Sequence, residues 1–413
     1  MIPRKSYLNL LAKFQDKPVI KVLSGLRRSG KSTLLKLMME RLKRDGVSSS
    51  NVLYIDKESL EFDAIRTYRD LQRFVTSRWK SVEGWKYLFV DEIQEIESWE
   101  KAIASLSGQR LADIYISGSN AHLLASDLAT LLSGRYVEIP VLSLTFKEFV
   151  QFRSAKGAEA SIEENFSLFL KYGGLPGIHE FELADDVVFQ YLYSIFNTIL
   201  YKDIVTRHKI RDTAMLDRIV RFAFDNCGSV TSAQRISEYM KSQRLRVTTD
   251  TVLNYLGYLT SAFLLRRARR YDIKGKRHLE VNDKYYLGDV GLRHGFIGYR
   301  DADIAGLLEN VVYLELLHRG YSVSIGKLQT KEVDFIAERG NEKLYIQVCY
   351  LLSDARVEAR EFSTLQAIDD NHPKFVLSMD RDWGEGREGI RRAYLPAFLL
   401  TPESVSDFGR GAP

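Results

Sequence analysis

The stretch from residue 25 to residue 33 constrains the fold of this chain most strongly. It reads GLRRSGKST and matches the phosphate-binding pattern G-x-x-x-x-G-K-[ST]. Residues 19–23 before it are mostly apolar, which predicts a buried strand, and apolar residues recur after it at helical spacing. The glycines therefore lie between a strand and a helix, where phosphate binding requires them. This context argues against an accidental match in a glycine-containing turn.

Each residue type in this loop has a chemical reason to be there. Glycines let the backbone approach phosphates closely, and the N-terminus of the following helix offers unpaired N–H groups. Lys31 is expected to reach the β- and γ-phosphates, Ser32 to ligate Mg²⁺ and Thr33 to bond the α-phosphate. ATP and Mg²⁺ are therefore the expected cofactors. The expected nucleotide-binding residues are Gly25, Arg28, Ser29, Gly30, Lys31, Ser32 and Thr33.

A second motif, YLFVDE, covers residues 87–92 and predicts a buried strand that ends in two acids. Asp91 is expected to hold Mg²⁺ through its coordination shell. Glu92 is expected to orient and deprotonate the water that attacks the γ-phosphate. A strand that merely ends in solvated acids is the alternative, and the nearby phosphate loop favours the catalytic interpretation.

Two further residues are candidates for the same reaction. A strand at 113–116 precedes Ser-Gly-Ser-Asn, and Asn120 is expected to contact the γ-phosphate or the attacking water, with Ser119 as the next choice. Arg135 is expected to supply positive charge to the transition state, from its own subunit or a neighbouring one. The alternatives are an ordinary turn and a surface arginine.

The middle of the chain predicts helices followed by extended segments. Residues 151–228 are mainly helical, with a turn at 172–177, and we interpret them as a helical lid. Helices at 233–240 and 249–259 precede extended segments, which suggests a winged helix-turn-helix over 229–295. Residues 241–277 hold ten Lys and Arg against two Asp, a net +8 that leaves −3 for the rest of a +5 chain. This predicts DNA binding through the phosphate backbone. A winged helix that serves only protein contacts is the alternative.

Residues 296–413 show the order helix, three strands, helix, strand, which is the core order of restriction-endonuclease-like folds. Glu309, Asp334 and Gln347 fall on the positions of the metal-binding residues in those enzymes, so they form a candidate second metal site. Cys349 stands where those enzymes carry lysine. We therefore expect a damaged site with weak metal binding at most and no robust nuclease activity. The alternative is that these acids make only structural contacts.

The bulk properties exclude several classes. No apolar stretch approaches the ~18–20 residues of a membrane-spanning helix, and no signal-peptide core follows the N-terminus. The two cysteines do not suggest a disulfide framework. We therefore expect a cytoplasmic protein without a membrane partner.

Several motifs together resemble a family of bacterial and archaeal AAA-type ATPases that carry a C-terminal restriction-endonuclease-like domain. They are GLRRSGKSTLL, YLFVDEIQ, YISGSN, SGRY, YGGLP, KYYLGDVGLR, LLENVVYLEL and KEVDF. The resemblance implies an α/β fold, in which a parallel-sheet P-loop NTPase domain at 1–150 precedes the lid, the winged helix and the nuclease-like domain. It also implies ATP binding and hydrolysis.

The leading hypothesis is an ATP-hydrolysing switch or motor that is coupled to a nucleic-acid or protein partner, with a homo-oligomer among the expected states. A regulatory DNA-binding protein in which ATP sets the conformation without turnover is the second hypothesis, and Glu92 favours the first. An ATP-dependent nuclease of a defence or repair system is the third, and Cys349 speaks against it.

Overall fold

The computed structural model describes residues 1–121, 132, 134–279, 283–300, 303–352, 355–381 and 386–401. The chain divides into two compact units. The first comprises Met1–Leu142 with Ser261–Phe263, and the second comprises Ser143–Thr260 with Leu264–Pro413.

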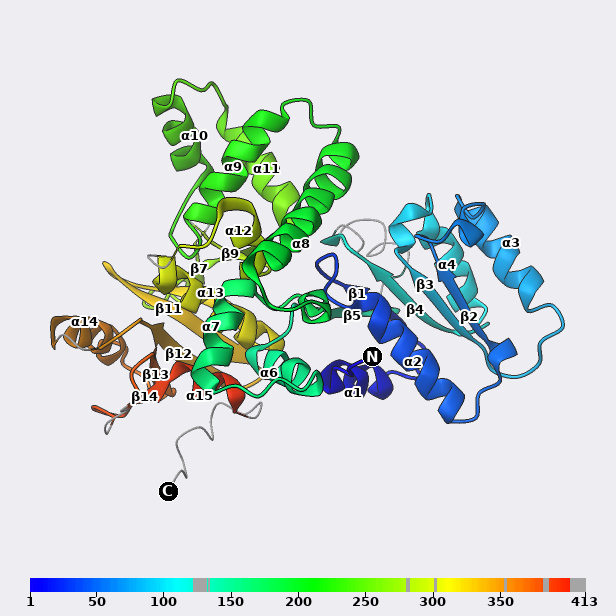
Figure 1. Ribbon diagram of the computed structural model, residues 1–413, viewed down its shortest axis with the longest axis horizontal. Helices are drawn as coiled ribbons and strands as arrows, with labels where there is room; N and C mark the ends of the chain where they lie inside the picture. Colours follow the sequence, from blue (N-terminus) through cyan, green and yellow to red (C-terminus); the bar gives the residue numbers. More distant parts are fainter. Residues whose placement is uncertain are drawn as a thin grey trace. The chain divides into compact units, whose positions relative to one another are not determined.

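The first unit is built on a five-stranded parallel sheet with the order β2-β3-β4-β1-β5 (Figure 1). Its strands are β1 (Ile20–Ser24), β2 (Val52–Asp56), β3 (Tyr87–Asp91), β4 (Asp113–Gly118) and β5 (Tyr136–Pro140). The apolar residues at 19–23, 87–90 and 113–116 predicted β1, β3 and β4. Because the strands are parallel, the ends of β1, β3 and β4 meet at one edge, and the phosphate-loop motif and the two acids follow directly there.

Helices cover both faces of this sheet. They are α1 (Lys5–Lys13) and α2 (Lys31–Arg44) on one face, and α3 (Tyr68–Arg78) and α4 (Trp99–Gly108) on the other. On β3, Leu88 and Val90 belong to the core beneath α3 and α4, while Tyr87 and Phe89 belong to the core beneath α1 and α2. Successive side chains of a strand point to opposite faces, so burial on both faces makes the strand apolar throughout.

The second unit begins with helices. They are α6 (Phe146–Ala155), α7 (Ile162–Tyr172), α8 (Asp185–Thr198) with a π-helical continuation at Ile199–Thr206, α9 (Thr213–Asp225), α10 (Ala233–Ser242) and α11 (Thr249–Ser261). The predicted turn after Tyr172 is present, and α7 ends there with Gly173 as its C-cap. The φ of Gly173 is 75°, a conformation that residues other than glycine rarely adopt. A short 3₁₀ helix, Pro176–Glu180, follows.

A seven-stranded sheet with the order β14-β13-β12-β11-β10-β7-β8 forms the other half of the second unit. Its members and neighbours are β6 (Leu265–Ala268), β7 (Arg270–Asp272), β8 (Arg277–His278), β9 (Lys284–Leu287), α12 (Val290–Ile297), α13 (Ile304–His318), β10 (Ser322–Leu328), β11 (Lys331–Arg339), β12 (Glu342–Val348), α14 (Ala355–Gln366), β13 (Lys374–Ser378), β14 (Ile390–Tyr394) and α15 (Leu395–Leu400). The predicted order of helix, three strands, helix and strand is present from α13 to β13. The last strand and helix were not predicted.

The extended segments after α11 depart from the predicted separate wing. β6 pairs with β9, but β7 pairs in parallel with β10 and brings β8 into the large sheet. Strands from both sides of residue 295 therefore share one sheet. An edge strand with unpaired backbone groups accepts a further strand, which explains why the hairpin joins β10.

Candidate functional site

The phosphate-loop motif joins β1 to α2 and has the tight backbone that its glycines predict. Gly25 has φ 152°, and a Cβ there would lie 2.2 Å from the carbonyl oxygen of Val141. Gly30 has φ 100° and occupies the N-cap of α2. Any side chain at these positions would clash or strain the loop. The loop therefore presents bare backbone at a helix N-terminus, which fits a phosphate group.

Lys31 lies inside the curve of this loop. Its side chain is 3% exposed, and its Nζ donates to the carbonyl oxygens of Gly25 and Leu26 at 3.0 and 3.1 Å. The ammonium group is thus held at the loop by weak neutral acceptors, which an anionic phosphate oxygen can replace with stronger charge-assisted bonds.

Arg4 supports the loop from the N-terminal segment, a contact that the sequence did not reveal. Its guanidinium donates to the carbonyl oxygens of Ser29 and Leu142 at 3.2 and 2.7 Å and stacks 4.5 Å from the centre of the Tyr7 ring. At 4% exposure, this buried cation fixes the backbone just before Gly30.

Asp91 is a buried carboxylate that is surrounded by hydroxyl groups. Tyr54 donates to its Oδ2 at 2.9 Å, the hydroxyl of Ser117 donates to Oδ1, and Ser32 forms a side-chain hydrogen bond with it. Burial raises the pKa of Asp91 above its usual value, and these hydrogen bonds offset part of the rise. Asp91 and Ser32, from the two motifs, therefore lie together as hard oxygen donors of the kind that Mg²⁺ prefers.

Glu92 directly follows Asp91 in an unusual backbone conformation, with φ 51° and ψ 51°. Its side chain accepts a hydrogen bond from Ser119 at 3.1 Å and one from the Gln94 amide. The Nζ of Lys31 lies 4.0 Å from its other oxygen. Burial alone raises the pKa of Glu92, but the charge of Lys31 and the hydrogen bond from Gln94 outweigh it, so the pKa lies below the usual value. Glu92 is therefore an ionised base beside the loop at neutral pH.

The remaining predicted residues of this site have different outcomes. Ser119 and Asn120 follow the end of β4, at the same edge as Glu92, and both are buried. Arg135 precedes β5, whose first residue Tyr136 pairs with Ile20 at the start of β1. It lies at the opposite edge of the sheet, about 16 Å away by the length of a five-residue strand. The structure does not bring Arg135 to the loop of its own chain.

Three residues near the site were missed by sequence reasoning. Tyr54 and Gln94 contact the two acids, and Arg27 pairs with Glu58 at 2.7 Å and adds a favourable charge near Glu92. Gln94 lies within the YLFVDEIQ motif, two residues after the base, which was an available signal. Tyr54 had none, because its contact depends on how β2 and β3 pair.

The acids of the second candidate site surround a buried lysine. Lys284 on β9 is 3% exposed, and its Nζ lies 3.1 Å from Glu309 and 2.8 Å from Glu332. Burial lowers the pKa of Lys284, but the charges of Glu309, Asp334 and Glu332 outweigh this and raise it. An ammonium group thus pairs with Glu309, one of the residues that were predicted to hold a metal.

Gln347 is also engaged. Its Oε1 accepts from the backbone N–H of Asp334 at 2.9 Å, and its Nε2 donates to Glu361 at 2.8 Å. Across the described part of the chain, no group of three His, Cys, Asp or Glu side chains is placed to hold a metal ion. Burial raises the pKa of the Cys349 thiol to about 12, so the thiol is neutral at neutral pH.

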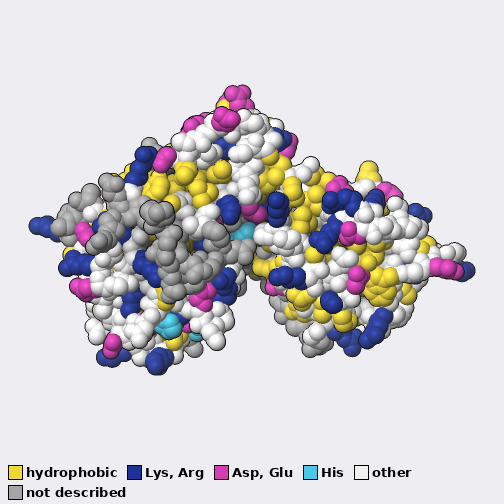
Figure 2. Space-filling view, turned by 90° about the horizontal axis from the view of Figure 1, so that it is seen from below, with side chains coloured by type: hydrophobic (Ala, Val, Ile, Leu, Met, Phe, Trp, Pro, Cys, Tyr) yellow, Lys and Arg dark blue, Asp and Glu magenta, His cyan; other side chains and the backbone are white. Residues whose placement is uncertain are grey.

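Most lysines and arginines of the basic segment 241–277 are exposed. Arg266 and Arg270 are partly buried, and Arg267 pairs with Asp283 at 2.6 Å. The exposed cations of the hairpin region are Arg269, Lys274, Lys276 and Arg277. On the face that Figure 2 shows, lysine and arginine side chains lie among acidic ones rather than in one broad patch. The distribution of charge on this face therefore does not indicate a nucleic-acid-binding surface.

A comparison with protein-family models finds a match that covers most of the first unit. A family model described as an AAA domain matches residues 17–150, and a domain of unknown function (DUF8612) matches residues 163–303. Among solved structures, the Walker-type ATPase PABY2304 of Pyrococcus abyssi matches 71% of this chain and 95% of its own, at 16% identity and a TM-score of 0.48. Among the described residues, no helix has the length and apolar character to cross a membrane.

Two relatives match most of the chain. An uncharacterized protein of Haemophilus influenzae is 39% identical over 97% of this chain and 99% of its own length. The uncharacterized protein MJ1544 of Methanocaldococcus jannaschii is 30% identical over 85% of this chain and 79% of its own. The chain therefore belongs to the protein family that these two relatives represent, and its first part is an AAA domain.

Proposed function

We propose that this chain binds ATP with Mg²⁺ at the phosphate loop and hydrolyses it to ADP and phosphate. The observation that carries the proposal is Glu92. A buried, ionised carboxylate at the edge of the sheet, 4.0 Å from the phosphate-loop lysine, is suited to accept a proton from water. A chain that only bound nucleotide would have no use for a base held there.

Each side chain of the site has its own role in this proposal. Lys31 exchanges the carbonyl oxygens of Gly25 and Leu26 for phosphate oxygens, and the bare backbone of residues 25–30 cradles the rest. Ser32 and Asp91 hold the metal, which neutralises charge on the phosphates when it is bound. Ser119 and Gln94 orient Glu92 through hydrogen bonds to its carboxylate. We assign Asn120 the contact to the γ-phosphate or the water.

Arg135 takes a different place in this proposal. Because it lies at the opposite edge of the sheet, a role at the transition state requires a second copy of the chain that presents Arg135 to its neighbour's nucleotide. Hydrolysis through Glu92 does not depend on that assembly.

We further propose that the nucleotide state is coupled to a nucleic-acid or protein partner. Support comes from the exposed cations Arg269, Lys274, Lys276 and Arg277, which suit the phosphate backbone of DNA. We propose a restriction-endonuclease-like fold for the final part of the chain, on the order of its elements. We propose that this part of the chain has no robust nuclease activity, because Lys284 pairs with Glu309 and the thiol of Cys349 is not a positive charge.

Nucleotide binding tests the first step. Lys31→Ala should weaken ATP binding by at least about 100-fold in titration calorimetry, since it removes the charge that the loop holds for the phosphates. Lys43→Ala is the matched control, because Lys43 is an exposed cation in the last turn of the same helix. Equal ATP affinity of the Lys31→Ala protein and the control would refute the assignment of the loop.

A further inference from the structure

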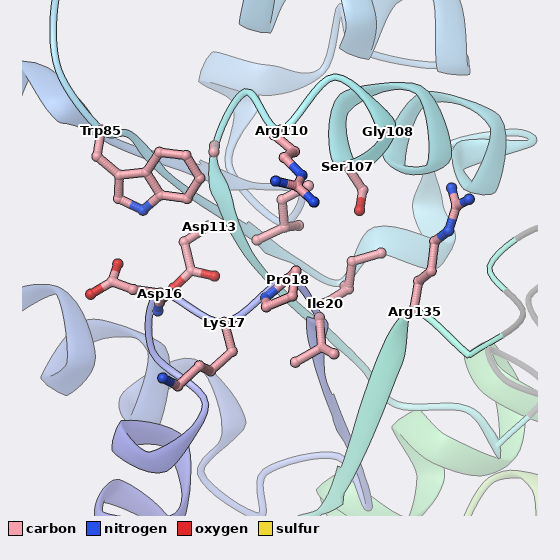
Figure 3. A pocket seen from close by; sticks show the side chains of 13 residues that line it. Asp16, Lys17, Pro18, Ile20, Trp85, Ser107, Gly108, Arg110, Asp113 and Arg135 are labelled. Carbon is pink, nitrogen blue, oxygen red and sulfur yellow. Dashed lines mark hydrogen bonds between the residues drawn. The ribbon is translucent and has the colours of Figure 1, made fainter.

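A cavity of about 520 Å³ lies in the first unit at the edge of the sheet where the strands begin (Figure 3). Its lining comes from the segment before β1, from the loop before β3, from the end of α4 and from the residues before β5. The phosphate loop follows the end of β1, so this cavity is at the opposite edge and is a separate site. Its volume lies within the range of about 300–1,000 Å³ that is typical of small-molecule sites.

One of the two acids in the cavity is compensated by a cation. Asp113 pairs with the buried Lys21 and accepts hydrogen bonds from the Tyr115 hydroxyl at 3.0 Å and from the backbone N–H of Asp16 at 2.9 Å. The carboxylate of Asp16 accepts from the Tyr87 hydroxyl at 2.8 Å. Lys21 therefore compensates Asp113, whereas the exposed carboxylate of Asp16 keeps one negative charge at the cavity.

The cations have no such partners. Within the described ranges, the side chains of Lys17, Arg110 and Arg135 form no ion pair and no hydrogen bond, and all three are exposed. The carboxylate of Asp16 contributes one negative charge and the C-terminus of α4 roughly half of one, which together are less than three full positive charges. The uncompensated charge of the cavity is therefore positive, and its ligand is an anion.

The cavity also has an aromatic wall. The indole of Trp85 is 46% exposed, which is unusual for so large an apolar group. Figure 3 shows Trp85 and Asp16 on one side of the cavity and Ser107 and Arg135 on the other, with Arg110 between them. A ligand that suits both sides carries a flat ring at one end and an anionic group at the other.

We propose that this cavity binds a nucleotide, with the base against Trp85 and the phosphate between Arg110 and Arg135. Every base has a face that stacks on an aromatic side chain, and guanidinium groups bind phosphate oxygens in a bidentate manner. The ligand is a free mononucleotide or the terminal nucleotide of a single strand, because a duplex does not fit a cavity of this size. Arg135 thereby acquires a role that needs no second copy of the chain.

The test uses the Lys31→Ala protein in the absence of Mg²⁺. Nucleotide binding at the phosphate loop is then suppressed, so the measurement reports on the cavity. AMP is titrated while tryptophan fluorescence is recorded. Trp79 and Trp99 are each 5% exposed, so Trp85 dominates the response among the described tryptophans, and Trp85→Phe verifies its origin. We expect AMP to quench the fluorescence and calorimetry to give the same affinity.

Variants of the lining decide the outcome. Arg110→Glu with Arg135→Glu should lower AMP affinity at least about tenfold, and Trp85→Ala about tenfold through lost stacking. The control is Arg69→Glu with Arg73→Glu, two exposed arginines of α3 outside the cavity, which should bind as the parent does. If the thermal midpoint of a charge-reversal variant falls, Arg110→Gln with Arg135→Gln replaces it.

The two sources are separated by comparing AMP with a short single-stranded oligonucleotide that bears a 5′-phosphate. Tighter binding of AMP supports a free nucleotide, and tighter binding of the oligonucleotide supports a strand end. The proposal is overturned if AMP does not bind, if the lining variants bind it as the parent does, or if inorganic phosphate binds as tightly as AMP. These outcomes leave ATP binding at the phosphate loop, tested by Lys31→Ala against Lys43→Ala, unaffected.

Discussion

At the residue scale, Glu92 shows how much of a site the sequence can specify. The DE pair after an apolar strand predicted its role, and that prediction is chemical and local. Its contact to Ser119 was not predictable, because it depends on the pairing of β3 with β4. A left-handed conformation at a non-glycine residue costs on the order of 1–3 kcal/mol and persists only where the surroundings hold it.

Lys284 shows most clearly what the sequence did not predict about the second candidate site. Its position on β9 gave no sign that it would reach Glu309 and Glu332. We predict that the wild-type chain, free of nucleotide, shows no measurable Mn²⁺ binding at this site. Lys284→Ala should bind Mn²⁺ at least about tenfold more tightly, because the acids lose their internal cation and favour another. Electron paramagnetic resonance of free Mn²⁺ measures the difference.

Adding Asp334→Asn to the Lys284→Ala chain is the control, and it should remove the gain. We also expect no DNA cleavage by the wild-type protein with Mg²⁺, since loss of a charged group at the transition state typically costs about 10²–10³ in rate. Cleavage by wild type that Asp334→Ala abolishes would show that the site is intact.

At the element scale, the residue before β7, the β7–β8 loop and β8 carry four exposed cations of the basic segment, Arg269, Lys274, Lys276 and Arg277. Reversing Arg269, Lys274, Lys276 and Arg277 to Glu should weaken duplex DNA binding at least about tenfold at low salt and flatten its salt dependence. Fluorescence anisotropy over a salt series measures both. Arg266 and Arg270 are left unchanged, because their partly buried positions would confuse loss of binding with loss of structure.

The matched control reverses four exposed cations of the first unit, Lys43, Arg44, Arg69 and Arg73. It changes the net charge equally, so a similar loss would mean that binding follows total charge. DNA binding by the hairpin variant that equals wild type at every salt concentration would assign the basic segment to another partner.

Also at the element scale, the contacts of Asp289 give a structural reason for the motifs YGGLP and KYYLGDVGLR. Its carboxylate accepts hydrogen bonds from the N–H groups of Gly174, Gly291 and Leu292, which ties the YGGLP turn to the start of α12. A Cβ on Gly173 would lie 2.3 Å from the same carboxylate. Such pairings join residues more than 100 positions apart, so local pattern shows that the residues are unusual but not what they contact.

At the scale of the whole molecule, the first unit was predictable and the second only in part. Strand and helix periods specify a parallel sheet with covered faces, and the five strands of the first unit appear as expected. In the second unit, β7 pairs with β10, for example Arg270 with Ile325. This pairing depends on which strand edge of the sheet is unpaired, and local sequence patterns do not predict it.

The central claim concerns the whole molecule as an ATPase, and phosphate release by the Glu92→Gln protein tests it most directly. A carboxamide keeps the shape and hydrogen bonding of Glu92 but cannot accept the proton of water. We predict that steady-state phosphate release from ATP and Mg²⁺ falls by about 10²–10⁴ relative to wild type, while ATP affinity stays within about threefold. Phosphate release at the wild-type rate by Glu92→Gln would contradict the account.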